Sequence, residues 1–272
     1  MTRIKLIATD VDGTFLNQQR TYNHNRFAAQ LNRLSSAGIR FVVASGNHLG
    51  HLKDVFAPTP QVQTFVAENG GLIVDHNRTL AEAQLPLPVV REVVQAILAD
   101  QTLRPQLLRL SGAHGTYLNR QDRSLDEASQ DYFFNNLVRV DDLTQVNDTI
   151  YKINGEWPND SIQTIAAKLN AHFPGLINAT ASGFGSIDIV APHMNKAVGL
   201  TQLAATWHIT PAEIAAFGDN DNDREMLAHV GLGVAMRNGT DSVKEVADLI
   251  TPHDNNHEGV LDVIDTILAD QG

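Results

Sequence analysis

The sequence feature that most constrains the fold is a short apolar run, residues 4–9, that ends in two closely spaced carboxylates, Asp10 and Asp12. Such a run predicts a buried parallel strand, and ligands of open α/β sheets bind just beyond the carboxyl ends of these strands. The spacing of two places both carboxylates on one side of an extended chain, and Gly13 then favours a turn. Because close carboxylates repel each other, the pattern indicates either a hard cation such as Mg²⁺ or an ordinary Asp-Gly turn.

The composition of the chain excludes several classes of protein. With 272 residues, 43% of them hydrophobic, the chain suffices for one large domain or two of ordinary size. It has no cysteine, which excludes disulfides and thiolate metal sites, and no apolar segment approaches the ~20 residues that span a bilayer. A net charge of −11 argues against nucleic acid or an anionic membrane as a partner. Without a recognisable export signal, these features predict a cytoplasmic globular protein.

Strands and helices alternate through the first third of the chain, as they do in α/β proteins. The predicted elements are a helix through Phe27, Leu31 and Leu34, strands at residues 39–44 and 64–67, a helix at 47–56 and a hairpin at 72–80. The strand at 39–44 ends in Ser45-Gly46-Asn47. A hydroxyl and a glycine ahead of a helix let hydroxyl and backbone N–H groups face an anion, and they also suit an ordinary strand-to-helix turn.

The pattern changes from about Glu82, and we expect an inserted domain over residues 84–185. Its predicted elements are a helix opened by Pro86 and Pro88, strands at residues 106–110 and 149–153, and a helix at 161–173. The two strands alternate enough to indicate an antiparallel sheet with one open face. The insertion ends at residues 181–185, where Gly183 and Gly185 flank Phe184 and indicate a hinge.

After this hinge the α/β alternation is expected to return. The predicted elements are a strand at residues 187–190 that leads back to the first sheet, a helix that begins at Lys196, a capped turn at 210–213, strands at 214–217 and 231–235, and helices at 242–247 and 258–269. The strand at 214–217 ends in a third polar cluster, Gly218-Asp-Asn-Asp-Asn-Asp223.

This acidic cluster has two interpretations. Asp219, Asp221 and Asp223 match the first half of an EF-hand calcium loop. The second half does not match, because Arg224 replaces the required glycine and Val230 the required glutamate. The better account is that Asp219 completes a magnesium site with the two carboxylates that follow the first strand.

Lys196 is a candidate site residue only in combination with these other groups, since a single lysine near the start of a helix is usually a solvated surface residue. Three acidic groups, a hydroxyl-glycine turn and one lysine each stand at the end of a strand or the start of a helix. Together they predict a phosphoryl-transfer site in which metal and lysine neutralise phosphate charge.

Four short motifs, in their order along the chain, resemble those of the haloacid dehalogenase-type phosphatases. They are Asp10-x-Asp-Gly-Thr14, Ser45-Gly46, Lys196 and Gly218-Asp-x-x-Asn-Asp223. The insertion resembles the cap of the Cof-type branch, and segments 43–47, 66–70, 180–185 and 254–259 resemble the SupH-like sugar phosphatases. Many Cof-type relatives have arginine where this chain has Asn47, and this departure, shared with SupH-like members, bears on specificity more than on activity.

The resemblance implies a fold and a reaction. The fold is α/β, with a doubly wound, Rossmann-like core at residues 1–83 and 186–272 and an inserted α/β cap at 84–185. The reaction is hydrolysis of sugar phosphate monoesters, with Mg²⁺ as the cofactor. Asp10 would attack phosphorus to form an aspartyl-phosphate, and Asp12 would protonate the leaving alcohol and then activate water.

The resemblance also implies which other residues bind metal or phosphate. Mg²⁺ would be held by Asp10, the backbone carbonyl of Asp12 and Asp219; the phosphate would be bound by Ser45, Gly46, Asn47, Lys196 and Asn222; and Asp223 would orient the last motif. The implied partner is a small phosphorylated sugar, with neither nucleic acid nor membrane, and no sequence feature indicates an oligomeric state.

Other functions remain open at this point. A mutase or phosphotransferase uses the same intermediate, a receiver-type signalling module also phosphorylates an aspartate, and a sugar-phosphate binding protein would share the binding residues. The cap and Asp12 count against a stored phosphate signal, and the intact aspartate pair counts against a binding protein. Histidine catalysis is not indicated, since no His-Glu-x-x-His pattern occurs and His48 and His51 are expected on an exposed helix face.

Overall fold

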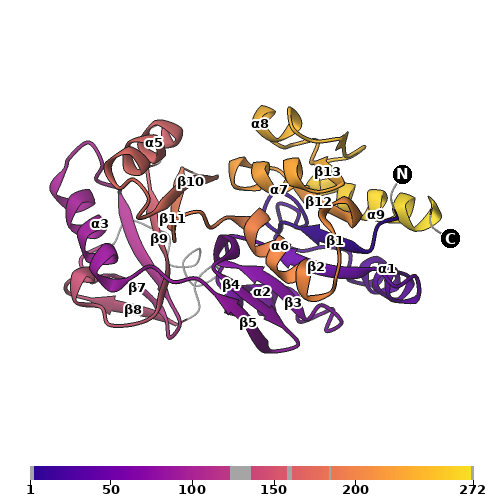
Figure 1. The fold of residues 1–272 in the computed structure, drawn as a ribbon, viewed down its shortest axis with the longest axis horizontal. Coiled ribbons are helices and arrows are strands. Elements are labelled where there is room, and N and C mark those ends of the chain that lie inside the picture. The colour runs from indigo at the N-terminus through magenta and orange to yellow at the C-terminus, as the bar shows by residue number, and fades with distance from the viewer. Residues whose placement is uncertain (1–2, 123–135, 158–160, 184, 271–272) are drawn as a thin grey trace.

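Two β-sheets organise the computed structural model, which describes residues 3–122, 136–157, 161–183 and 185–270 (Figure 1). The eight-stranded core sheet has the order β14-β13-β12-β1-β2-β3-β4-β5, and the six-stranded cap sheet has the order β10-β11-β9-β6-β7-β8. The core strands are β1 (Leu6–Thr9), β2 (Arg40–Ala44), β3 (Thr64–Ala67), β4 (Leu72–Asp75), β5 (Arg78–Glu82), β12 (Ile214–Gly218), β13 (Leu232–Ala235) and β14 (Leu249–Ile250). The cap strands are β6 (Leu107–Gly112), β7 (Thr116–Asn119), β8 (Leu137–Val140), β9 (Ile150–Glu156), β10 (Asn178–Gly183) and β11 (Ser186–Val190).

Helices cover both faces of the core sheet, which is parallel from β14 to β3 and antiparallel at β4 and β5. One face packs against α1 (His24–Ser36), α2 (Leu49–Val55) and α9 (Gly259–Asp270), and the other against α6 (Lys196–Thr206), α7 (Arg224–His229) and α8 (Asp241–Lys244). Helices on both faces are what a parallel sheet requires, because both of its faces are apolar. The predicted doubly wound α/β core is confirmed.

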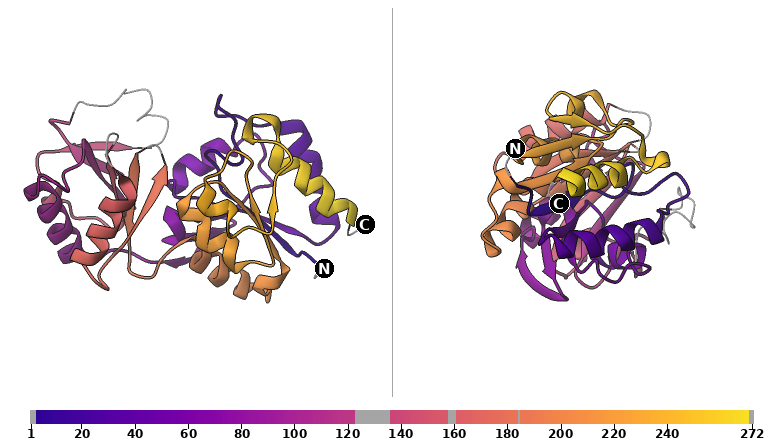
Figure 2. Two further views of the ribbon diagram at one scale, coloured as in Figure 1. Left: turned by 90° about the horizontal axis from the view of Figure 1, so that it is seen from above. Right: turned by 90° about the vertical axis from the view of Figure 1, so that its right-hand side faces the viewer.

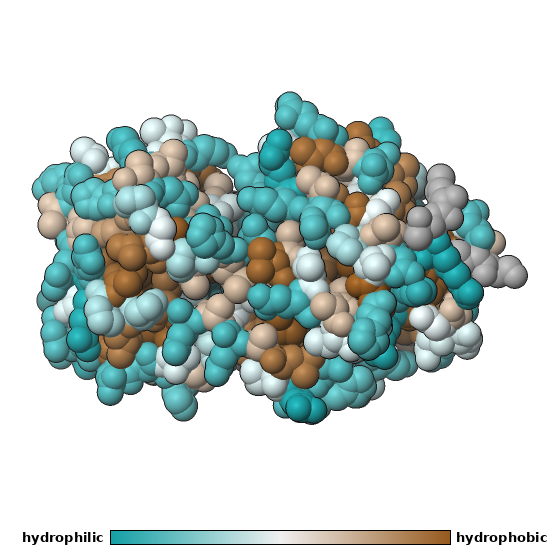
Figure 3. All heavy atoms as spheres, viewed as in Figure 1, coloured by the Kyte–Doolittle hydropathy of each residue, from teal (hydrophilic) through white to brown (hydrophobic). Residues whose placement is uncertain are grey.

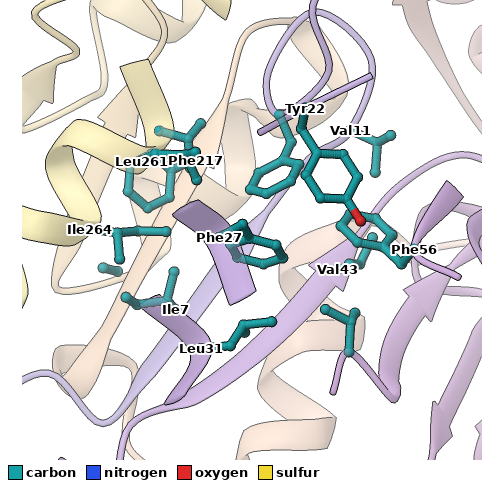
Figure 4. Packing of buried hydrophobic residues seen from close by; sticks show 14 of the residues in the cluster. Ile7, Val11, Tyr22, Phe27, Leu31, Val43, Phe56, Phe217, Leu261 and Ile264 are labelled. Atoms are coloured by element: carbon teal, nitrogen blue, oxygen red, sulfur yellow. The ribbon is translucent and has the colours of Figure 1, made fainter. Parts of the chain in front are cut away.

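Phe27, on α1, lies in the middle of the apolar layer on the first of these faces (Figure 4). Its ring centroid is 4.7 Å from that of Phe15 and 4.9 Å from that of Phe41. The helix starts where it does because the side chain of Asn23 accepts the backbone N–H of Arg26 at 3.1 Å. Each buried side chain of this size contributes about 1.5–3 kcal/mol, so the sheet gives the residues at its strand ends a rigid base.

The cap sheet is apolar on one face and polar on the other. α3 (Leu87–Ala99) and α5 (Ile162–His172) cover the apolar face, and the strands are antiparallel except that β7 and β8 run parallel. Figure 1 and the left view of Figure 2 show the cap at one end of the molecule and both chain termini at the other. The polar face of the cap sheet is therefore the face available to the core.

The predicted hinge is wrong, and the strand after it is present as predicted but does not lead back to the core sheet. Residues 178–183 and 186–190 form the hairpin of β10 and β11, and β11 also pairs with β9, so both strands belong to the cap sheet. The positive φ angles of Gly183 (90°) and Gly185 (75°) serve this hairpin turn, and Phe184 lies outside the described residues. The chain instead crosses between the two parts after β5 and after β11. Glycine pairs suit hairpin turns as well as hinges, and only strand pairing distinguishes the two.

The outer surface shown in Figure 3 is mostly hydrophilic or neutral, with apolar residues in small patches. Across the described ranges, every helix is too short or too polar to cross a lipid bilayer.

Candidate active site

Polar residues follow three neighbouring strands of the core sheet at their carboxyl ends. β1 lies between β12 and β2, so Asp10, Asp219 and Ser45 come together at one edge of the sheet. These residues line a cavity of about 710 Å³ whose other wall belongs to the cap sheet. A cavity of this volume is in the range of small-molecule sites.

Lys196 connects two buried carboxylates at this edge. Its Nζ lies 2.7 Å from Oδ1 of Asp10 and 2.7 Å from Oδ1 of Asp223, and its side chain is completely buried. Burial alone would lower the pKa of Lys196, but the charges of Asp10 and Asp223 raise it above its ordinary value. Lys196 therefore supplies a permanent positive charge beside the predicted nucleophile.

The acidic cluster, defined as Asp10, Asp219 and Asp223, has the character of a cation site. One oxygen of each carboxylate lies within 4.8 Å of the others. Burial, and then the charges of Asp223 and Asp219, raise the pKa of Asp10 well above its ordinary value, although Lys196 opposes this effect. Burial and the charge of Asp223 likewise raise the pKa of Asp219 to about 7. Crowded carboxylate oxygens whose repulsion needs a cation fit Mg²⁺, which prefers hard oxygen ligands.

Asp219 is held against the turn that follows β1. Thr14 donates its hydroxyl to Oδ1 of Asp219 at 2.7 Å. Gly13 has a φ of 74°, and a Cβ atom there would lie 2.4 Å from Oδ2 of Asp219. A side chain at position 13 would be strained and would also displace this carboxylate. Gly13 and Thr14 thus allow the carboxylate of Asp219 to lie close to the turn after β1.

We expect Asp219→Asn to stabilise the metal-free protein while it removes metal-dependent turnover. The pKa of Asp219 is about 7 in the folded chain against 3.8 ordinarily, so the unfolded chain loses this proton first as the pH rises. Asp219 therefore costs stability increasingly from pH 3.8 to about 7, and the cost is constant above that. Asparagine removes the cost and still accepts the bond from Thr14, with an expected gain of about 0.5–2 kcal/mol near neutral pH.

The measurement is thermal unfolding of both proteins in chelator, once at about pH 5 and once at about pH 8. The gain should be larger at the higher pH. Asp141→Asn, at a carboxylate that is 84% exposed, is the control and should change neither value. A gain that does not grow with pH would show that the charge of Asp219 is not its source.

Asp12 lies beside the acidic cluster and not within it. Asn47 donates from Nδ2 to Oδ2 of Asp12 at 2.5 Å, and the partly exposed Asp12 borders the cavity. The two aspartates of the first motif thus have different surroundings: Asp10 is buried against the ammonium group of Lys196, and Asp12 is partly exposed at the border of the cavity. Asn47 also holds Asp12 by its side chain, a contact that the sequence did not indicate.

The acidic loop, defined as residues 218–223, is held in place by hydrogen bonds within the core. Oδ2 of Asp223 accepts the backbone N–H groups of Asp219 at 3.0 Å and of Asn220 at 3.2 Å. Asn222 donates from Nδ2 to Oδ1 of Asn69 at 3.1 Å and reaches the cavity. Asp223 therefore has the contacts of an orienting residue.

The turn that is predicted to bind phosphate, residues 45–47, leads directly into α2 and is called the phosphate turn below. The backbone N–H of Asn47 donates to Oγ of Ser45 at 3.1 Å, and His48 caps the helix by accepting the N–H of Gly50 at 3.0 Å. His51, expected on an exposed face, is instead 2% exposed, because this face of α2 packs on the sheet. His51 thus has structural surroundings, whereas His48 caps α2 and also lines the cavity.

Sequence reasoning expected the cap to cover the substrate but did not identify which cap residues line the cavity. Its polar face presents a set of side chains that we call the polar cap face: Arg109, Ser111, Lys152, Asn154, Glu156 and Asp188. Arg109 donates to Oδ1 of Asn154 at 2.7 Å and to Oε1 of Glu156 at 2.5 Å, and Asn154 donates to Asp188 at 2.8 Å. The signal in the sequence was the alternation of polar residues at positions 109 and 111 and at 152, 154 and 156, which places them on one side of a strand.

A doubly wound sheet whose strand ends gather carboxylates, a lysine and a hydroxyl turn under a cap defines the class of this protein, a phosphoryl-transfer enzyme. The chain belongs to the haloacid dehalogenase-like hydrolases, whose family model matches residues 7–264. The resemblance to the Cof-type phosphatases of this family is confirmed.

Named relatives extend over nearly the whole chain. It is 36% identical over 267 residues to the 5-amino-6-(5-phospho-D-ribitylamino)uracil phosphatase YbjI of Escherichia coli (strain K12). The match covers 97% of this chain and 96% of the relative. The similarly named YitU of Bacillus subtilis (strain 168) is 27% identical over 95% and 96% of the two chains. The crystal structure of SMU.1108c from Streptococcus mutans UA159 superposes with a TM-score of 0.92 at 34% identity, over 98% and 99% of the chains. The protein is therefore a phosphatase, a hydrolase of phosphoric monoesters.

Proposed function

We propose that this phosphatase hydrolyses phosphate monoesters of sugars, with Mg²⁺ as its cofactor and an aspartyl-phosphate on Asp10 as its intermediate. The observation that carries this proposal is the setting of Asp10. Its carboxylate is buried at the end of the central strand, 2.7 Å from the ammonium group of Lys196 and within the acidic cluster. Lys196, together with a cation bound at the acidic cluster, would offset the repulsion from Asp219 and Asp223, so that this carboxylate could act as a nucleophile toward phosphate.

The residues of the cluster fit the metal. Asp10, Asp219 and the backbone carbonyl of Asp12 would hold Mg²⁺, and Asp223 would support them through Lys196 and the loop. The bound ion would supply the charge neutralisation that lets an anionic carboxylate approach an anionic phosphate.

Asp10 and Asp12 have different roles in the two half-reactions. An oxygen of Asp10 bonds to phosphorus while the bond from phosphorus to the leaving oxygen breaks, and Asp12 gives its proton to that oxygen. Asp12 then takes a proton from water, whose oxygen displaces Asp10 and releases inorganic phosphate. Ser45, the backbone N–H groups of Gly46 and Asn47, Lys196 and Asn222 bind the phosphoryl oxygens throughout.

The polar cap face supports a leaving group rich in hydroxyl groups. Its charged side chains are mostly paired with each other, as in the contact of 2.5 Å between Arg109 and Glu156, so it offers hydrogen bonds without a large unpaired charge. The relatives favour a second candidate of the same chemistry, 5-amino-6-(5-phospho-D-ribitylamino)uracil, for which YbjI and YitU are named. Its ribityl chain is also a polyol, and the cavity of about 710 Å³ has room for the attached ring.

A panel of phosphate esters tests this proposal. We expect release of inorganic phosphate from sugar phosphates and from the ribitylamino compound with Mg²⁺, and a fall of at least about 10²-fold in chelator, because the metal compensates several kcal/mol of charge. Full activity in chelator would contradict the metal role. Turnover of nucleotides alone would contradict the proposed substrate class.

The same assay separates hydrolysis from phosphotransfer. A phosphotransferase or phosphomutase would pass the phosphate from Asp10 to a sugar and would release little phosphate when no acceptor is present. We expect phosphate release at the same rate with and without an added sugar, since Asp12 is placed to activate water.

We also propose that the chain is divided as the motifs predict, into a core and a cap inserted between the second and third motifs. The return to the core follows β11, in place of the predicted boundary between residues 185 and 186. The cytoplasmic location remains a prediction from composition.

A further inference from the structure

The phosphate turn is held by its carbonyl groups. The carbonyl of Ser45 accepts the backbone N–H of Asn69 at 3.0 Å, and that of Asn47 accepts the backbone N–H of Glu68 at 3.2 Å. The carbonyl of Gly46, between them, accepts a hydrogen bond from Nζ of Lys152. Two of the three donors thus come from the core loop after β3, and the third comes from a side chain of the cap, 106 residues further along the chain.

Lys152 is fixed in place by a buried ion cluster that spans both parts of the protein. Its Nζ lies 3.3 Å from Oε2 of Glu68 in the core and 3.6 Å from Oδ2 of Asp188 in the cap. Glu68 is completely buried and accepts the hydroxyl of Ser111 at 2.7 Å, and Asp188 accepts from Asn69 at 2.6 Å. Burial alone would lower the pKa of Lys152, but Asp188 and Glu68 raise it, so the lysine stays charged.

The space around Gly46 is tight on the side of Asn69 and Asp188. A Cβ atom at Gly46 would lie 3.0 Å from both Oδ1 of Asn69 and Oδ2 of Asp188. The carbonyl of Gly46 and the N–H of Asn47 belong to one trans peptide unit and point in opposite directions. A cation on the carbonyl side therefore fixes the orientation of the N–H of Asn47, which donates to Oγ of Ser45, and polarises it.

We propose that Lys152 is a positioning residue for phosphate binding: from the cap, its ammonium group holds the Gly46 carbonyl so that the phosphate turn presents its N–H groups to the phosphoryl oxygens. In this arrangement one of the three donors that hold the phosphate turn comes from the cap, so the position of the turn depends on the contact between cap and core. Lys152 does not itself need to contact the substrate. This inference rests on the proposed function of the phosphate turn.

The test compares Lys152→Met with Lys152→Arg and with Lys168→Met, an exposed lysine on the cap helix α5. The readouts are the inhibition constant of inorganic phosphate with Mg²⁺ and the kcat/KM values for para-nitrophenyl phosphate and for a sugar phosphate. A hydrogen bond to a charged group accounts for about 10–100-fold in binding. We expect Lys152→Met to weaken phosphate inhibition by about this factor and to lower both kcat/KM values equally, whereas arginine restores part of the loss and Lys168→Met changes nothing.

Two results would overturn the proposal. If the inhibition constant of phosphate is unchanged and only the kcat/KM value for the sugar phosphate falls, Lys152 contacts the leaving group instead. If all three constants are unchanged, the contact with Gly46 has no role. Should Lys152→Met fail to fold, Lys152→Gln, whose amide can still donate to the carbonyl, is measured in the same way and should show a smaller loss of the same kind. A wild type that hydrolyses no ester would contradict the proposed function separately, and calorimetric binding of phosphate would still compare the variants.

Discussion

Asp12→Asn is expected to accumulate a phosphorylated protein, whereas Asp10→Asn is expected to form none. With asparagine at position 12, Asp10 still attacks a substrate whose leaving group needs little protonation, but no base remains to activate water. With asparagine at position 10 the nucleophile is absent. General acid–base assistance is typically worth ~10²–10⁴-fold, so steady-state turnover should collapse in both variants.

The measurement is the intact mass of each variant after it is mixed with an activated aryl phosphate and Mg²⁺ and quenched rapidly in acid. A phosphate adduct in Asp12→Asn alone supports the two roles. Asp141→Asn, at the exposed carboxylate, is the control and should turn over normally without an adduct. An adduct in Asp10→Asn, or normal turnover in Asp12→Asn, would contradict the mechanism. The different surroundings of the two side chains, one beside Lys196 and one beside Asn47, are the structural reason to expect different outcomes.

Lys196→Met should have the largest effect on stability. Removing one partner from a buried ion pair typically costs about 3–5 kcal/mol, because the remaining charge is left uncompensated. Here two carboxylates, on Asp10 and Asp223, lose their common cation. The raised pKa of Lys196 means that its contribution is fully present below the ordinary lysine pKa of 10.5, so the loss applies across the neutral range.

Urea unfolding of the wild type and Lys196→Met near neutral pH measures this loss, and activity should fall below detection in the same preparation. Lys53→Met is a matched control, because Lys53 lies at the surface and bonds only to the side chain of Asn77 among the contacts described. Equal midpoints for Lys196→Met and wild type would show that the three charges do not stabilise one another. Added Mg²⁺ should recover part of the stability, since it offers the carboxylates another cation.

Local patterns in the sequence were sufficient for most of the core. The apolar run before Asp10 predicts β1, the spacing of Phe27, Leu31 and Leu34 predicts α1, and the capping box at residues 210–213 is present as a short helical turn. These features depend on contacts within a few residues, which periodicity and capping report directly. Among the α-helices and strands of the core, α7 and the two-residue edge strand β14 were not predicted, because both are too short to show a period.

The cap was less predictable because its assignment depends on which strands pair. The segment at residues 187–190 has the apolar character of a core strand, yet it pairs with β9 and β10. Gly183 and Gly185 were interpreted as a hinge for the same reason: a turn between two strands and a joint between two domains have the same local sequence.

The sequence by itself determined which residues stand at the strand ends, and therefore the class of chemistry, because a strand followed by carboxylates, a hydroxyl or an acidic loop is a local pattern. Only the tertiary structure decided which of them meet and what completes them. Asp10 contacts Lys196, which lies 186 residues further along the chain, and the phosphate turn contacts Lys152 of the cap. Such contacts arise from sheet order and from packing of the cap on the core, and a buried charge finds its partner through these long-range contacts, which no local pattern records.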